Sequence, residues 1–136
     1  MADSPLKRVV IVDDSVEFRL LLALHLDALD IRVVAEADEG RSGLAAVLEA
    51  EPDLVVTDLQ MPGEDGIWLT RRLGEERPDL TVVMATSTEA DSILVGQAIE
   101  AGATRIVCKL DGPASVAAVV HQTLTASQDG PEPPVA

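Results

Sequence analysis

Hydrophobic runs alternate with amphipathic segments along most of the chain. Five short runs rich in Val, Ile, Leu and Ala predict β-strands, and their continuous apolar character is typical of strands covered on both faces. Longer segments with apolar positions at helical spacing follow each run and predict helices. The strands are expected near residues 8–12, 31–37, 54–57, 80–85 and 104–109, and the helices near 15–29, 40–51, 67–76, 89–101 and 113–126.

Regular alternation of strand and helix predicts a single α/β domain, a (βα)₅ unit with a doubly wound parallel five-stranded sheet. Local signals support these elements, because Ser15 can cap the first helix, Pro52 ends the second and Gly102 can end the fourth in a left-handed conformation. Four leucines keep near-helical spacing within the first helix: Leu20, Leu21, Leu24 and Leu29.

The C-terminal stretch SQDGPEPPVA differs in composition from the rest of the chain. It is rich in proline and acidic residues and has almost nothing to bury, which is typical of a disordered segment. We therefore expect the folded domain over residues 1–126 and a disordered tail over 127–136.

Polar residues stand where the predicted strands end. Because the carboxyl ends of parallel strands share one edge of the sheet, these residues are expected to converge on one small site. The acids are Asp13 and Asp14 after the first strand and Asp58 after the third, and the others are Thr86 and Ser87 after the fourth strand and Lys109 at the end of the fifth.

The residue types at this edge favour metal-assisted phosphoryl chemistry. An adjacent acidic pair such as Asp13 and Asp14 is by itself most often a solvated turn, and a lysine at a strand end most often reaches solvent. Clustered carboxylates, however, repel one another unless a cation is present, and oxygen ligands suit Mg²⁺ or Mn²⁺ better than Zn²⁺. Asp58 could then accept a phosphoryl group, while Lys109 and a hydroxyl group contact the phosphoryl oxygens.

Composition limits the partners and the compartment. A formal net charge of -14 and a pI near 4.2 disfavour attraction to nucleic acid or anionic lipid, so proteins or small cationic species are expected as partners. No apolar run approaches the roughly 18 residues of a membrane span, and the N-terminus lacks the apolar segment of a signal peptide. One cysteine, Cys108, suits a reducing compartment, so we expect a cytoplasmic protein.

Four sequence motifs together resemble the response-regulator receiver domain of two-component signalling, of the chemotaxis-regulator-like type. They are VVIVDDS, VVTDLQMPGEDG, VVMATS and IVCK, in the order and with the spacing of that family, and the resemblance covers about residues 6–126. It implies a flavodoxin-like sheet with strand order 2-1-3-4-5.

The resemblance also implies a role for each site residue. Asp58 would be phosphorylated by a sensor histidine kinase or a phosphotransfer protein, as one step of a phosphorelay. Mg²⁺ would be ligated by Asp14, by Asp58 and by the backbone carbonyl of Gln60, with Asp13 assisting through water. Thr86 would move toward the phosphoryl group and Lys109 would pair with it. Such a phosphoprotein accepts and slowly loses its phosphoryl group and is not a turnover enzyme.

Output in such a domain is a shift between two populations that changes the surface of the fourth helix, fifth strand and fifth helix, where a downstream protein binds. Two positions depart from the usual pattern. Ile106 stands where many receivers have an aromatic switch residue, so an aromatic rotamer change cannot carry the signal. Leu110 stands where many have a proline after the lysine, which removes the expected cis peptide bond.

We therefore expect a stand-alone receiver that acts as a phosphorylation-controlled interaction switch, without direct contact to nucleic acid or membrane. One alternative is a degenerate receiver that binds partners without being phosphorylated. Another is a phosphohydrolase of the haloacid-dehalogenase type, although that family requires a second acid two residues beyond its nucleophile, where Gln60 stands.

Overall fold

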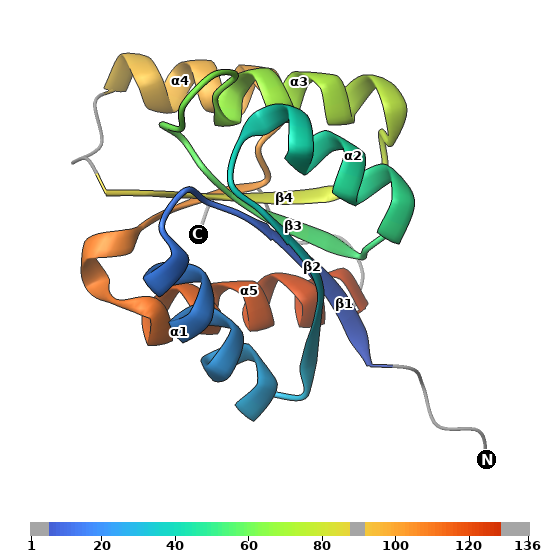
Figure 1. The fold of residues 1–136 in the computed structure, drawn as a ribbon, viewed down its shortest axis with the longest axis vertical. Helices are drawn as coiled ribbons and strands as arrows, with labels where there is room; N and C mark the ends of the chain where they lie inside the picture. Colours follow the sequence, from blue (N-terminus) through green and yellow to red (C-terminus); the bar gives the residue numbers. More distant parts are fainter. Residues whose placement is uncertain (1–5, 88–91, 129–136) are drawn as a thin grey trace.

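A parallel β-sheet lies between two layers of helices in the computed structural model, which describes residues 6–87 and 92–128 (Figure 1). The strands are β1 (Lys7–Val12), β2 (Ile31–Ala37), β3 (Leu54–Asp58), β4 (Thr81–Thr86) and β5 (Arg105–Cys108). The helices are α1 (Val16–Ala28), α2 (Gly40–Ala50), α3 (Gly66–Glu76), α4 (Ser92–Ala101) and α5 (Pro113–Gln128), with a 3₁₀ turn η1 (Lys109–Asp111) before α5.

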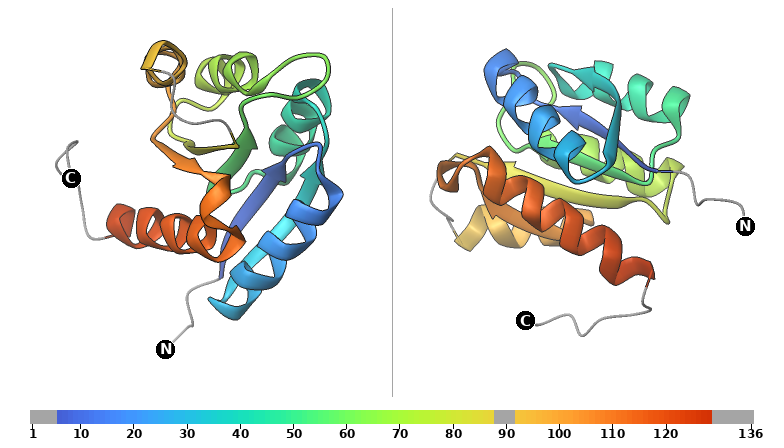
Figure 2. Two further views of the ribbon diagram at one scale, coloured as in Figure 1. Left: turned by 90° about the vertical axis from the view of Figure 1, so that its left-hand side faces the viewer. Right: turned by 90° about the horizontal axis from the view of Figure 1, so that it is seen from below.

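The strand order is β2-β1-β3-β4-β5 and each neighbouring pair is parallel, which confirms the predicted flavodoxin-like sheet. Helices α1 and α5 contact each other on one face of the sheet (Figure 2). Helices α2, α3 and α4 cover the other face, where α3 contacts both of its neighbours. No helix within the described ranges is long and apolar enough to cross a membrane.

Each face of the sheet has its own hydrophobic core, which explains the continuous apolar runs in the sequence. Along β1, Val9 and Ile11 pack toward α1 and α5, whereas Val10 and Val12 pack toward α2 and α3. All four side chains are fully buried. Alternation along a strand places successive side chains on opposite faces, so a strand covered on both sides must be apolar throughout.

Helix α1 forms as predicted, but the leucines that indicated it are not the residues that it buries. Its buried stripe consists of Phe18, Leu22 and Leu26, at intervals of four residues. The leucines at positions 20, 21, 24 and 29 are all exposed, with Leu20 and Leu24 more than half exposed. Because α1 is apolar around most of its circumference, helical spacing alone did not identify the face that meets the sheet.

Several predicted boundaries shift by a few residues. Strand β5 ends at Cys108, and Lys109 begins the 3₁₀ turn instead of closing the strand. Gly102 follows α4 with a φ of 118°, which agrees with the expected positive-φ residue at that helix end. Helix α5 continues to Gln128, past its predicted end, and the rest of the predicted tail, 129–136, lies outside the described residues. The predicted start of the fourth helix at Glu89 also lies outside them.

The loop between β3 and α3 closes tightly on the end of β3. The Gly66 amide donates to the Leu59 carbonyl oxygen at 2.9 Å. A Cβ atom at Gly66 would lie 2.1 Å from the carbonyl oxygen of Asp58, closer than any real contact. Gly74, in the same helix, has no atom within 4 Å of the corresponding Cβ position.

We expect Gly66→Ala to lower the free energy of unfolding by about 1–3 kcal/mol, because the added methyl group must displace backbone. The matched change Gly74→Ala should instead stabilise the domain by up to about 0.5–1 kcal/mol, since it removes a glycine from an open helical position. Chemical denaturation of both variants measures this difference. Equal effects of the two changes would contradict the close approach at Gly66.

Candidate functional site

The site residues predicted from the sequence lie at the carboxyl edge of the sheet, on the left in Figure 1. Asp13 and Asp14 directly follow β1, Asp58 is the last residue of β3, and Lys109 directly follows β5. Thr86 is the last residue of β4 and is buried, with 7% of its surface exposed. The parallel topology is thus the reason that residues distant in sequence approach one another here.

Three carboxylates form a cluster that could hold a cation. One oxygen each from Asp13, Asp14 and Asp58 lies within 4.8 Å of the others. Asp13 and Asp58 are buried, with 1% and 6% of their surfaces exposed, whereas Asp14 is exposed. Two buried carboxylates and one that faces solvent are suited to an ion that keeps some of its water, which is typical of Mg²⁺.

Lys109 lies against the two buried acids of this cluster. Its Nζ atom is 2.7 Å from Oδ2 of Asp13 and 3.4 Å from Oδ2 of Asp58. The same atom lies 4.4 Å from the centre of the Phe18 ring. With one ammonium group beside three carboxylates, two negative charges of the described cluster remain uncompensated. A divalent cation therefore fits the charge as well as the oxygen donors.

Burial raises the pKa of the Asp58 carboxyl group, and the neighbouring charge of Asp13 raises it further. Lys109 and the backbone amides of Leu59 and Gln60 act in the opposite direction without cancelling the rise. The folded state therefore holds this proton to a higher pH than the unfolded chain does. Between the two pKa values the unfolded chain has lost this proton while the folded domain keeps it, so the free energy of unfolding falls as pH rises.

Without divalent cations, Asp58→Asn should therefore stabilise the folded domain near neutral pH. In a domain of this size, each gain of about 1 kcal/mol in the free energy of unfolding raises the melting temperature by a few degrees. The difference from the unmutated protein should be absent in acid, grow as pH rises through the interval between the two pKa values, and then stay constant. Thermal unfolding in a chelating buffer at a series of pH values measures it. A lower melting temperature of Asp58→Asn at neutral pH would contradict a raised pKa of Asp58 in the folded domain.

The loop that carries Asp13 and Asp14 is held from several sides. The Asp13 amide donates to the Ala37 carbonyl oxygen at 2.9 Å, and one carboxylate oxygen of Asp13 accepts from the Ser15 amide at 2.8 Å. The Arg19 guanidinium donates to the Asp13 carbonyl oxygen and forms an ion pair of 2.9 Å with Glu36. These contacts fix Asp13 before any ion binds, which reduces the cost of ordering the site.

The other residues singled out in the sequence lie on the loop after β3, on β4 and β5, and in η1. Gln60 is exposed in the loop after β3, next to the Leu59 carbonyl that Gly66 holds. Thr86 pairs with Cys108 across β4 and β5, and Ile106 pairs with Met84 in the same register. Leu110 is 69% exposed, and every peptide bond in the described ranges is trans.

Two contacts of the site were not predicted from the sequence. Phe18 and Arg19 stand in the first turns of α1, and the sequence signals there concern helix formation alone. Their contacts with Lys109, with Asp13 and with Glu36 depend on how α1 packs against the sheet. A helical pattern does not contain this information.

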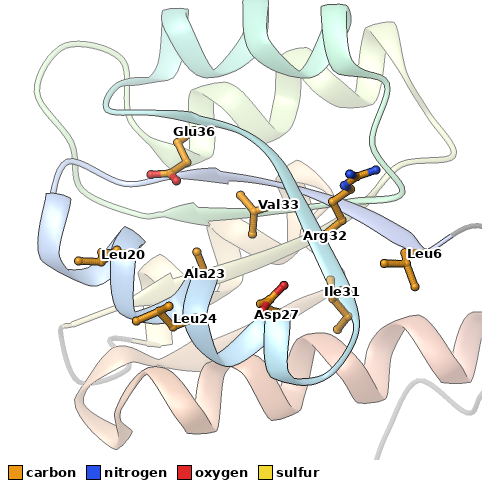
Figure 3. A pocket seen from close by; sticks show the side chains of 9 residues that line it. All are labelled: Leu6, Leu20, Ala23, Leu24, Asp27, Ile31, Arg32, Val33 and Glu36. Atoms are coloured by element: carbon orange, nitrogen blue, oxygen red, sulfur yellow. The ribbon is translucent and has the colours of Figure 1, made fainter.

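A shallow groove between α1 and β2 lies apart from the acidic cluster (Figure 3). Apolar side chains line much of it, including Leu6 and the exposed Leu20 and Leu24. None of the residues predicted for the functional site contributes to it. The carboxyl edge of the sheet, where acids and a lysine meet, is therefore the candidate site.

Comparison with known proteins agrees with the resemblance found in the sequence motifs. The family model of the response regulator receiver domain matches residues 9–121. A protein-glutamate methylesterase/protein-glutamine glutaminase from Natronomonas pharaonis is 40% identical over 107 residues, which cover 79% of this chain and 30% of the relative. The transcriptional regulatory protein LiaR from Bacillus subtilis is 36% identical over 115 residues, which cover 84% of this chain and 54% of LiaR.

Among solved structures, a two-component response regulator of the LuxR family from Aurantimonas sp. SI85-9A1 superposes with a TM-score of 0.82. The identity is 29%, and the match covers 89% of this chain and 86% of the other. The present chain thus spans less than a third of the methylesterase relative and about half of LiaR. In these relatives the matching region is one part of a longer protein.

Proposed function

Because the chain belongs to the response regulator receiver domain family, we propose that Asp58 accepts a phosphoryl group from a sensor histidine kinase or a phosphotransfer protein. The domain is a phosphoacceptor receiver of two-component signalling. One observation supports the choice of residue: Asp58 ends β3, with oxygen atoms of two further carboxylates within 4.8 Å and the ammonium group of Lys109 at 3.4 Å. The other lysine, Lys7, begins β1 at the opposite edge.

Asp14, Asp58 and the backbone carbonyl of Gln60 would hold Mg²⁺, or Mn²⁺, with Asp13 assisting through water. The donor set supports this assignment, since it consists of oxygen atoms and carries uncompensated negative charge. The bound ion would neutralise charge on the transferred group. Asp13, already held by Lys109 and by backbone hydrogen bonds, needs no rearrangement to take part.

Three residues of the chain would have separate roles in the transfer. A carboxylate oxygen of Asp58 attacks phosphorus, the bond from phosphorus to the donor atom breaks, and the donor leaves with that electron pair. The ammonium group of Lys109 would pair with one phosphoryl oxygen, and the hydroxyl group of Thr86 would donate a hydrogen bond to another. We propose no turnover beyond slow loss of this phosphoryl group, so the described domain would act as a switch.

The output surface is proposed to be α4, β5 and α5, where a downstream protein would bind. Exposed apolar side chains support a protein as the partner, since Ile93 and Ile99 on α4 are 69% and 59% exposed. Ile106 on β5 packs against the cluster that contains Met84 and Ala98. An aliphatic residue there makes displacement of α4 the route by which Thr86 would transmit the signal. The acidic character of the chain disfavours direct contact with nucleic acid.

Incubation with acetyl phosphate and Mg²⁺, followed by intact-mass measurement, tests the proposal. We expect the gain of one phosphoryl group per chain, removed by hydroxylamine as an acyl phosphate is. Hydrolysis of a chromogenic phosphate ester should not proceed beyond the buffer control. An unchanged mass with Mg²⁺ and acetyl phosphate would support the degenerate receiver instead, and steady ester hydrolysis would support a phosphohydrolase.

A further inference from the structure

The aromatic ring of Phe18 lies beside the ammonium group of Lys109. Nζ is 4.4 Å from the ring centre, which is within the range of a cation–π contact. Phe18 is buried, with 8% of its surface exposed. Its backbone amide donates to the Ser15 side chain at 3.1 Å, which caps α1 and fixes the turn that carries the ring.

Besides the ring, two carboxylates contact the Lys109 ammonium group among the described residues. Lys109 begins a short 3₁₀ turn, and the next residue, Leu110, is 69% exposed. The carboxylate contacts of Nζ, to Asp13 and Asp58, involve the groups that a cation and a phosphoryl group would engage. A bound cation would compete with Nζ for those carboxylates, whereas the contact with the uncharged ring would persist.

We propose that Phe18 is a positioning residue of this site, whose ring face keeps the Lys109 ammonium group beside the carboxylate cluster. The inference rests on the proposed role of Lys109 in pairing with the phosphoryl group. Partial burial strengthens the contact, because the side chain of Lys109 is only 13% exposed and little water competes for its charge. Without the ring, the flexible four-carbon stem allows the ammonium group to move toward solvent.

Phe18 also packs in the core formed with Leu22 and Leu26, so a purely structural role must be separated from the positioning role. One feature of the sequence allows this. Phe18 is the only phenylalanine, so biosynthetic replacement by fluorinated phenylalanine changes this ring alone. Added fluorine withdraws electron density from the ring face and leaves the shape of the side chain nearly unchanged, which weakens a cation–π contact selectively.

We expect the rate of phosphorylation by acetyl phosphate to fall stepwise from monofluorinated to trifluorinated Phe18, while the melting temperature stays near that of the unmodified protein. Loss of the whole contact in Phe18→Leu should slow labelling by about twofold to thirtyfold, which corresponds to ~0.5–2 kcal/mol. The control Leu22→Val reduces packing in the same core without touching Lys109, and it should lower stability without slowing labelling.

A second readout does not depend on phosphorylation. The chain has two lysines, so lysine labelling gives two sets of side-chain NMR signals. The ring current of Phe18 should shift the ε-methylene protons of Lys109 upfield relative to those of Lys7, and Phe18→Leu should abolish the shift. Absence of the shift, or labelling of the trifluorinated protein at the unmodified rate, would overturn the proposal. A wild-type protein that shows the shift but takes up no phosphoryl group would instead overturn the proposed function and leave the positioning of Lys109 in place.

Discussion

The Asp58→Asn variant is expected to take up no phosphoryl group from acetyl phosphate and Mg²⁺ while folding as the unmutated protein does. The amide is nearly the size of the carboxylate, but it has no negative charge and no nucleophilic oxygen of comparable strength. Because Asp58 is a buried acid with a raised pKa, its neutral replacement should not destabilise the domain. Intact-mass measurement over time gives the extent of labelling directly.

Asp79→Asn is the matched control for this experiment. Asp79 is exposed and precedes β4, at the opposite edge of the sheet from the carboxylate cluster. This variant should label at the rate of the unmutated protein. Labelling of Asp58→Asn at a comparable rate would place the acceptor on another residue and would refute the assignment.

The Asp14→Ala variant is expected to lose both Mg²⁺ binding and phosphorylation. Changes in groups that only orient metal ligands cost about tenfold to a hundredfold in affinity, so removal of a proposed ligand should weaken binding at least that much. Asp14 is exposed, and no described structural hydrogen bond depends on its side chain, so stability should change little. Calorimetric titration with Mg²⁺ measures the affinity, and chemical denaturation checks the fold.

Asp79→Ala serves as the control here, since it removes one surface carboxylate without touching the site. It should bind Mg²⁺ with unchanged affinity, which shows that the loss in Asp14→Ala does not arise from the lower net charge. If both variants bind Mg²⁺ as the unmutated protein does, the cation is not held by Asp14.

Sheet topology explains why most of the candidate site could be predicted from the sequence. Asp13, Asp58 and Lys109 each stand at the end of an apolar run, and a parallel sheet gathers such ends at one edge. The backbone at Lys109 differs from the prediction. The lysine was expected to close the fifth strand, but it begins a 3₁₀ turn that is followed by Gly112, with a φ of 98°. The lysine side chain nevertheless reaches both buried acids.

Contacts between separate elements could not be predicted in the same way. The sequence indicates a helix from Val16, yet its abundant leucines leave the inward face undetermined, and the structure buries Phe18 and Leu22 instead of Leu20. The rotation of α1 about its own axis places the Arg19 guanidinium where it donates to the Asp13 carbonyl oxygen. The same rotation places the Phe18 ring against the Lys109 ammonium group. Tertiary packing sets that rotation, and local periodicity does not encode it.

Chemical mapping of the labelled residue shows whether Asp58 is the phosphoacceptor. Borohydride reduction of the labelled protein converts an aspartyl phosphate to homoserine, which peptide mass spectrometry locates in the sequence. We expect homoserine at position 58 and no such change at Asp13 or Asp14. Homoserine at either of those residues with position 58 intact, or a phosphoryl group found on His25 or His121, would contradict it.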